Sequence, residues 1–325
     1  MTEYLIRRLL QGLLVIFAMS LVVFVGVFAI GDPMKMFIDP AADQDTIAAT
    51  MHNLGLDRPM WEQYLLFVWN ALQGDLGQSF FYDSPALSLI LNRMPATLEL
   101  AVVSTLIAAG FGIPLGMVAG YYPDSFGAKA IMTGSILGFS LPSFWVGLML
   151  ILIFAVEFGW APSGGRGDTV VILGIKLSVF TRDGLSHIIM PAINLALFNL
   201  ALVVRLTRAN MRETLPQDFV KYARAKGLRM SRIISVHVLK NIMIPVVTII
   251  GMEFGTLIAF AIVTETVFSW PGMGKLILDS IIVLDRPVIV AYLMIVATMF
   301  VLINLAVDVL YSFLDPRIRI SDVAS

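Results

Sequence analysis

Few side chains in this sequence could perform covalent chemistry. The three histidines, His52, His187 and His237, are not paired with a serine in a nucleophile motif, and no H-E-x-x-H zinc pattern occurs. Cysteine is absent, which excludes a thiolate nucleophile, a thiolate metal site and a disulfide framework. No G-x-x-x-x-G-K-S/T loop is present to cradle the phosphates of ATP. We therefore expect no enzyme, no ATPase, no metal site and no cofactor in this chain.

The side chains that could bind a partner are concentrated in residues 205–245, a basic segment between two apolar ones. It contains two acids, Glu213 and Asp218. It contains nine basic residues: Arg205, Arg208, Arg212, Lys221, Arg224, Lys226, Arg229, Arg232 and Lys240. Basic segments beside membrane spans stay in the cytosol, and links between helices usually have about 2–8 residues. This segment is therefore expected to be cytosolic, and its length indicates that it binds something there.

A short amphipathic helix is expected at residues 218–227 of this segment. One face of it carries residues at i, i+3, i+4 and i+7: Phe219, Tyr222, Ala223 and Lys226. Asp218 is suited to be its N-cap, and Gly227 is suited to end it because glycine readily adopts the left-handed conformation. Ala223 and Gly227 are small and four residues apart, which would let another surface approach closely.

Two interpretations of this helix remain open from the residues alone. A basic amphipathic helix can lie on anionic lipid headgroups. It can also dock in a groove of a cytosolic partner and transmit rigid-body motion to the spans. A second amphipathic stretch, at 233–239, leads into the next apolar segment.

The composition predicts an integral membrane protein. Of 325 residues, 58% are hydrophobic and 14% are charged, and the mean hydropathy is +0.87. A helix needs about 20 apolar residues to cross about 30 Å of hydrocarbon. Six segments are long enough, and all six are expected to be helices, which predicts an all-α fold: 9–30, 96–120, 130–156, 188–206, 242–267 and 288–313.

The distribution of lysine and arginine predicts the orientation of these spans. Arg7, Arg8, Lys129, the basic segment and the C-terminal Arg317 and Arg319 all fall on one side if there are six spans. Residues 32–93, on the other side, contain eight acids and three bases. Both termini are therefore expected in the cytosol. The first span follows two arginines as a secretory signal would, but it is too long for one and is interpreted as a retained helix.

The outer parts of the chain have patterns of their own. Residues 61–72 have aromatic and aliphatic side chains at helical spacing, which predicts an amphipathic helix. Residues 159–186 are rich in glycine and serine and are expected to form an irregular lid. The run 269–274 contains a Pro-Gly pair and is expected to be a tight turn near the outer surface.

Glu99, Glu253 and Asp308 are ionisable residues that fall within or near the apolar segments. Glu99 and Asp308 are near predicted helix ends, where a charged side chain can reach the membrane interface at a low cost in free energy. Glu253 is deeper, and it is expected either to line a pathway or to pair across a subunit interface. Glycines and prolines are frequent in the second and third spans, where they could serve close packing or hinges. An ion-coupled secondary transporter is an alternative, but Glu253 is its one candidate coupling group and no internal repeat is evident.

An ordered set of motifs along nearly the whole chain resembles the first permease subunit of the dipeptide, oligopeptide and nickel ABC importer family. The strongest piece, 222–228 (YARAKGL), resembles the cytoplasmic EAA loop of ABC importer permeases. The chain departs from the general EAA pattern in having Lys221 in place of its glutamate and a late proline, Pro245. The other matching runs are 4–9 (YLIRRL), 54–57 (LGLD), 74–77 (GDLG), 95–100 (PATLEL), 264–274 (TETVFSWPGMG) and 315–317 (DPR).

The resemblance implies a type I importer fold in the bacterial inner membrane and assigns roles to residues. It makes Glu253 a candidate for the translocation path. A contact of the outer turn with an external substrate-binding protein would involve Trp270, Pro271 and Gly272. The helix that couples to an ATPase would comprise Asp218, Phe219, Tyr222, Ala223, Arg224, Ala225, Lys226 and Gly227.

The resemblance also implies partners and a substrate class. The partners would be a second, related permease forming a heterodimer, two ATPases that hold ATP and magnesium, and the binding protein. Short peptides are the expected substrate, with nickel, glutathione, opines and oligosaccharides as alternatives. The chain divides into an N-terminal segment with the first span (1–30), an outer region (31–95), a five-helix core (96–315) containing the coupling loop (207–241), and a tail (316–325).

Overall fold

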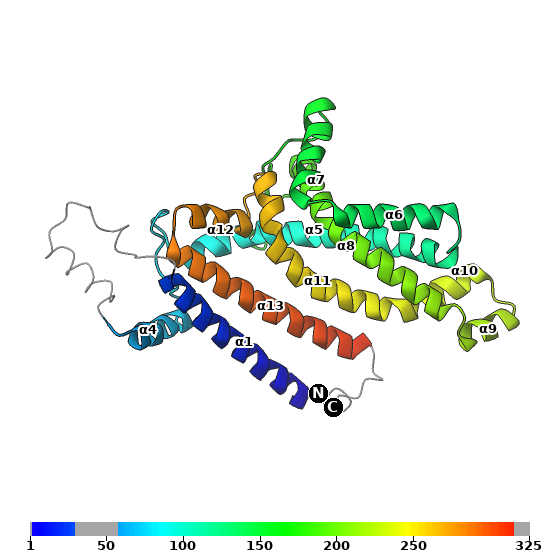
Figure 1. Cartoon of the computed structure of the whole chain (residues 1–325), viewed down its shortest axis with the longest axis horizontal. Coiled ribbons are helices and arrows are strands. Elements are labelled where there is room, and N and C mark those ends of the chain that lie inside the picture. Colours follow the sequence, from blue (N-terminus) through cyan, green and yellow to red (C-terminus); the bar gives the residue numbers. More distant parts are fainter. Residues whose placement is uncertain (1, 30–57, 315–325) are drawn as a thin grey trace. The chain divides into compact units, whose positions relative to one another are not determined.

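The computed structural model describes residues 2–29 and 58–314 (Figure 1). Several sequence predictions lie outside the described residues. One group lies in the outer region before residue 58 and concerns its acidic residues, His52 and the 54–57 motif. The other group lies in the C-terminal tail and concerns Arg317, Arg319 and the 315–317 motif.

Helices make up most of the described part of the chain, which also contains one small hairpin. Two of its helical segments are π-helices, η1 (Ile151–Glu157) and η2 (Ile233–Val238), and strands β1 (Val170–Ile172) and β2 (Ile175–Leu177) pair antiparallel. The α-helices are α1 (Thr2–Ala29), α4 (Met60–Leu72), α5 (Ala86–Tyr121), α6 (Phe126–Ser140), α7 (Ser143–Leu150), α8 (Arg182–Thr214), α9 (Asp218–Ala225), α10 (Met230–Arg232), α11 (Leu239–Val267), α12 (Met273–Ile282) and α13 (Arg286–Leu314).

Within the described ranges, five continuous helical stretches are long and apolar enough to span a membrane, and a bent pair makes a sixth. The five are Ile6–Gly26, Ala86–Tyr121, Arg182–Thr214, Met230–Val267 and Arg286–Val309. The six apolar segments predicted from the sequence are therefore confirmed.

The third span is not the single helix that was expected. It is broken between α6 and α7 with a bend of 104° (Figure 1). Pro142 disfavours the helical conformation of the residue before it, and Leu141 accordingly has an extended backbone with φ −80° and ψ 137°. Prolines inside α5, α8 and α11 interrupt none of those helices.

The chain divides into two compact units, each described here by itself. The first consists of Met1–Asn92 and Ile277–Val301. In it, α4 lies against α1: the hydroxyls of Ser20 and Tyr64 are hydrogen-bonded over 2.8 Å, and the Tyr64 ring contacts the Phe24 ring edge-on at 5.3 Å between centroids. The amphipathic helix predicted for the outer region is thus confirmed as α4. The functional division of the chain made from the sequence stays a prediction.

The second unit, Arg93–Leu276 and Leu302–Ser325, contains α8 as its central helix. α8 packs against α6, α7 and α11 (Figure 1). Its contact with α5 is close because three glycines of α5 face it. A Cβ atom at Gly112, Gly116 or Gly120 would lie 2.6–2.8 Å from side chains of α8, which is too short for any side chain to fit. These three glycines therefore serve helix packing, whereas the hinge role considered for the second and third spans stays a prediction.

The outer segment before α8 is more ordered than the irregular lid that was expected. It contains the β1–β2 hairpin, and Glu99 of α5 fixes it in place. Arg166 donates to one oxygen of Glu99 over 2.7 Å, and the backbone amide of Val179 donates to the other over 2.9 Å. The position expected for Glu99, near a helix end, was wrong because α5 begins at Ala86, well before the apolar segment.

Candidate functional site

Helix α9 forms where the sequence predicted it, but its first turn differs in detail. Gln217, with an extended backbone (φ −67°, ψ 153°), is the N-cap, and Asp218 is the first helical residue. The Asp218 carboxylate instead pairs with Lys221 over 2.9 Å. A hydrogen bond from the Lys221 ammonium and its positive charge lower the pKa of Asp218. Assigning Asp218 as the N-cap was therefore wrong.

Gly227 ends α9 as predicted. Its φ is +77°, its amide donates to the carbonyl of Arg224 over 2.8 Å, and the amide of Leu228 donates to the carbonyl of Ala223 over 3.2 Å. This pair of bonds is the Schellman arrangement, in which glycine supplies the left-handed residue. The side chain of Leu228 then packs back against the apolar cluster beneath the helix.

One face of α9 is buried in its own chain. Val220 is 1% exposed and Ala223 is 7% exposed. They belong to an apolar cluster, here called the loop core, with Met211, Ile233, Val238 and Ile242. The small surface expected at Ala223 for close approach by a partner was therefore wrong, because the side chains of α8, η2 and α11 already cover it.

The other face of α9 is exposed, and it is basic and aromatic. Tyr222 is 63% exposed, and the Nζ atom of Lys226 lies 4.6 Å from the centroid of its ring, a cation–π contact. Phe219 is half-buried against the loop core. The remaining predicted coupling residues, Asp218, Arg224, Ala225 and Gly227, are exposed. A Cβ atom on Gly227 would meet nothing within 4 Å among the described residues.

The loop core joins α9 firmly to a spanning helix. Ile233 and Val238 are fully buried beneath α9, and they lie on η2, which continues without a break into α11 as the stretch Met230–Val267. π-Helical turns within α-helices are rare and are frequent at functional sites. The sequence indicated an amphipathic stretch here but not its π-helical geometry. A force on α9 would therefore reach the span through close-packed side chains.

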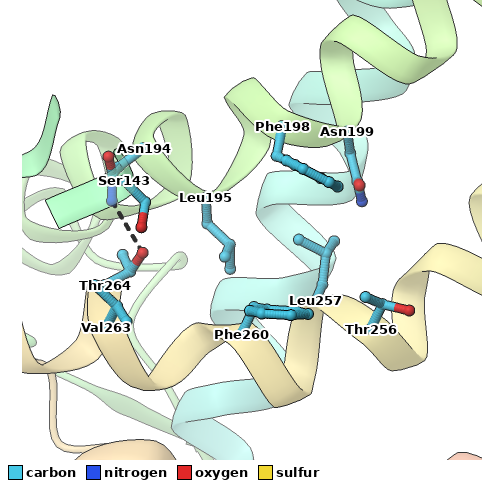
Figure 2. A pocket seen from close by; sticks show the side chains of 10 residues that line it. All are labelled: Ser143, Asn194, Leu195, Phe198, Asn199, Thr256, Leu257, Phe260, Val263 and Thr264. Atoms are coloured by element: carbon cyan, nitrogen blue, oxygen red, sulfur yellow. Dashed lines mark hydrogen bonds between the residues drawn. The ribbon is translucent and has the colours of Figure 1, made fainter. Parts of the chain in front are cut away.

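A cavity of about 140 Å³ lies between α8 and α11 beside the break in the third span. Phe198 and Leu195 of α8 and Phe260 and Leu257 of α11 form its apolar middle (Figure 2). Polar side chains lie at its two ends: Ser143, Asn194 and Thr264 at one, Asn199 and Thr256 at the other. The Asn194 amide donates to the Thr264 hydroxyl over 2.9 Å. Interrupted helices at membrane depth are tolerated where they are buried in protein or line a cavity.

Glu253 lies one helical turn before Thr256 on α11 and is half-buried. It lines a second, smaller cavity of about 10 Å³ along the same seam between α8 and α11. Thr105 and Asn199 also line this cavity, and Asn199 lines both cavities. Over the described residues, neither Glu253 nor Asn199 has a hydrogen-bond or ion-pair partner in this chain. The role predicted for Glu253 on the path stays a prediction.

The outer turn at 269–274 is held tightly. The indole of Trp270 is fully buried and donates to the carbonyl of Ala96 over 2.9 Å. Gly272 is buried against the carboxylate of Glu265, and Pro271 is half-buried. The expected contact of these three residues with a binding protein stays a prediction, and Pro271 is the most accessible of them. Glu265 was not predicted from the sequence as a site residue, although it lies within the 264–274 motif.

Comparison with known proteins identifies the family. The chain matches the family described as the binding-protein-dependent transport system inner membrane component over residues 112–320, and the N-terminal model of the same system over 1–101. It is 40% identical over 335 residues to the di/tripeptide transport system permease protein DppB of Pseudomonas aeruginosa, covering 98% of this chain and 99% of that protein. It is 38% identical over 321 residues to the oligopeptide transport system permease protein AppB of Bacillus subtilis, covering 98% and 100%.

A solved structure supports the fold. A chain of the methionine ABC transporter MetNI, in inward-facing conformations, aligns with a TM-score of 0.54 and 16% identity over 70% of this chain and 97% of that chain. Permeases of this family work with ATPase and substrate-binding partners. This chain therefore belongs to the inner-membrane permeases of binding-protein-dependent ABC importers, and it is a multi-pass transport component rather than an ATPase.

Proposed function

We propose that this chain forms part of the translocation path for short peptides that an external binding protein delivers. It pairs with a second, related permease, and two ATPase subunits hold ATP and magnesium, so that this chain needs no cofactor of its own. The peptide substrate is supported by relatives that align along almost their whole length and are named di/tripeptide and oligopeptide permeases.

In this proposal α9 is the coupling helix. The observation that carries this role is its two-sided construction: Val220 and Ala223 are buried in the loop core, while Tyr222 and Lys226 are exposed. A helix that is buried on one face in its own chain and exposed on the other is suited to dock in a groove of a partner. The ATPase can shift the spans only by binding α9 differently in two states, and the loop core carries that difference to α11.

Substitutions on the exposed face of α9 test the proposal. Tyr222→Ala with Lys226→Ala should leave the permease in the membrane and reduce the ATPase stimulation by peptide-loaded binding protein about tenfold or more. Lys240→Ala is the control because it removes an exposed positive charge from the first turn of α11, outside α9. ATPase activity and peptide uptake are measured for the purified complex in lipid vesicles. Equal, small effects of both changes would favour a helix that lies only on lipid headgroups.

Uptake assays in the same vesicles distinguish peptides from the other candidate substrates. A glutathione transport system permease protein, GsiC of Escherichia coli, is 38% identical to this chain over 320 residues, so glutathione is the first alternative. Uptake of labelled dipeptide, glutathione, nickel, an opine and an oligosaccharide is compared with the binding protein that belongs to this system. Uptake driven by an ion gradient without ATP would instead indicate a secondary transporter.

A further inference from the structure

We propose that Glu253, Asn199 and Thr105 form a subsite on the path that binds the free α-ammonium group of the peptide. The inference rests on the proposed peptide function and adds the chemical group that this chain recognises. Glu253 is an ionisable residue within a span. Placing such a side chain there costs free energy, and it usually faces a cavity and a partner. Glu253 faces a cavity, and no cation of the described chain pairs with it.

The polar groups around this cavity favour a hydrogen-bond donor. A carboxylate only accepts hydrogen bonds, and an ammonium group offers three donors. The Thr105 hydroxyl already donates its proton to the carbonyl of Ala101 over 2.8 Å, so its oxygen can only accept a further bond. Asn199 lines the same cavity, and its amide oxygen can serve as a third acceptor. The Glu253 carboxylate, the Thr105 oxygen and the Asn199 amide therefore line a space of about 10 Å³, which suits one small polar group such as an ammonium head.

The neighbouring cavity is placed to receive the rest of the peptide. Asn199 lines both cavities, so that the space around Glu253 and the larger space of about 140 Å³ adjoin along the seam between α8 and α11. The larger cavity is apolar in its middle, between Phe198 and Phe260 (Figure 2). Its far end carries the Asn194 amide, whose Oδ1 atom is buried without a hydrogen-bond partner among the described residues. A peptide anchored by its ammonium group would lay apolar side chains on the aromatic rings and turn amide groups toward Asn194.

This arrangement predicts that the path itself prefers peptides with a free amino terminus. That selectivity would be independent of the binding protein. N-acetylation removes the positive charge and two of the donors. A neutral amide would leave the Glu253 carboxylate without compensation, and hydrogen bonds to charged groups are stronger than those between neutral groups. A free amino terminus should therefore improve binding in this path about tenfold or more.

The absence of cysteine from the chain allows a direct test. A Thr256→Cys reporter places one thiol in the larger cavity at its Asn199 end (Figure 2). The complete permease–ATPase complex is reconstituted in lipid without the binding protein, and the rate of maleimide labelling of this chain is measured. Dialanine should protect the thiol at a concentration about tenfold or more below that needed for N-acetyl-dialanine.

Variants in the reporter background assign the effect to Glu253. Glu253→Gln should raise the half-protecting concentration of dialanine to that of N-acetyl-dialanine, whereas Glu253→Asp should keep part of the preference. Glu62→Gln removes an exposed carboxylate from α4 and should change neither value. If Glu253→Gln does not assemble, Asn199→Ala is used, and it should weaken the same preference.

Two results would overturn the inference: protection by neither peptide, or an unchanged preference in Glu253→Gln. ATP-driven uptake of dialanine with the binding protein is measured on the same preparations. Uptake by the complex together with an unchanged preference in Glu253→Gln would refute only the subsite. No uptake of any peptide would refute the proposed function itself.

Discussion

The hydroxyl of Thr97 donates a hydrogen bond to the carboxylate of Glu265 over 2.6 Å, which joins two spanning helices across 168 residues of sequence. The same Thr97 oxygen accepts the amide of Met273 over 2.8 Å, and the second oxygen of Glu265 accepts the amide of Lys275 over 3.0 Å. Glu265 is fully buried. These bonds fasten the outer turn at 269–274 to α5 and α11 and satisfy amides at the start of α12.

Thr97→Val should therefore destabilise the permease. Valine has a similar shape but cannot donate to Glu265 or accept from Met273, and leaving buried polar groups without their hydrogen bonds costs about 1–3 kcal/mol. Thr97→Ser keeps the hydroxyl and should stay close to the parent protein. Thermal unfolding of the solubilised complex, followed by size-exclusion chromatography, measures the difference. Equal midpoints for the valine and serine variants would contradict the role of this hydrogen bond.

The ion pair between Glu99 and Arg166 leads to a second prediction, about the outer hairpin. The side chains are 2% and 11% exposed, and breaking a buried pair by removing one partner typically costs about 3–5 kcal/mol. Glu99→Gln should release the segment around β1 and β2 and make the bonds after Lys176 and Arg182 more sensitive to trypsin. Glu62→Gln is the control, because the Arg58–Glu62 pair is 45% and 39% exposed and such pairs contribute about 0.3–0.5 kcal/mol. Equal trypsin sensitivity of both variants would argue against the anchor.

The Thr97–Glu265 and Glu99–Arg166 contacts are of a kind that the sequence alone does not predict. The apolar segments are local in the sequence, so their composition predicted all six spans. The break in the third span was not predicted, because several other prolines lie inside unbroken helices and only packing decides which one interrupts a span. The partners of Glu99 and Glu265 lie 67 and 168 residues away, and no local pattern indicates contacts at that distance.

The candidate coupling helix shows the same limit. Its position, its length and its end at Gly227 were predicted, since spacing and a glycine are local signals. Which face is buried was not predicted, because the loop core that covers Ala223 comes from Met211 of α8 and from Ile233 of η2. The cavities between α8 and α11 likewise depend on packing between distant segments.

Glycine substitutions in α5 give a third prediction. A Cβ atom at Gly116 would lie 2.6 Å from the Cβ atom of Thr207 and 2.7 Å from the carbonyl oxygen of Val204, whereas at Gly110 it would meet no atom within 4 Å in the part of the chain that the structure describes. Gly116→Ala should separate α5 from α8 and lower stability by about 1–3 kcal/mol, the usual cost of overpacking. Gly110→Ala should be neutral or stabilise by about 0.5–1 kcal/mol, because alanine is the better helix former. Thermal unfolding of the two variants checks this, and a Gly116→Ala variant as stable as Gly110→Ala would refute the close contact.

Gly227 gives the last prediction, because it separates the fold of the coupling loop from its partner contact. At φ +77° a residue with a Cβ is strained by about 1–2 kcal/mol, but its Cβ atom would meet no atom of the described residues within 4 Å. Gly227→Leu should therefore leave the permease assembled while its side chain obstructs the surface on which an ATPase would dock, so that ATP hydrolysis continues and peptide uptake falls about tenfold or more. Gly227→Asn is the matched control, since asparagine tolerates the left-handed conformation and is smaller. Uptake and ATPase activity are measured on the same vesicles. Full uptake by Gly227→Leu would show that no partner approaches this end of α9, whereas equal losses in both variants would assign the effect to backbone strain and not to a docking surface.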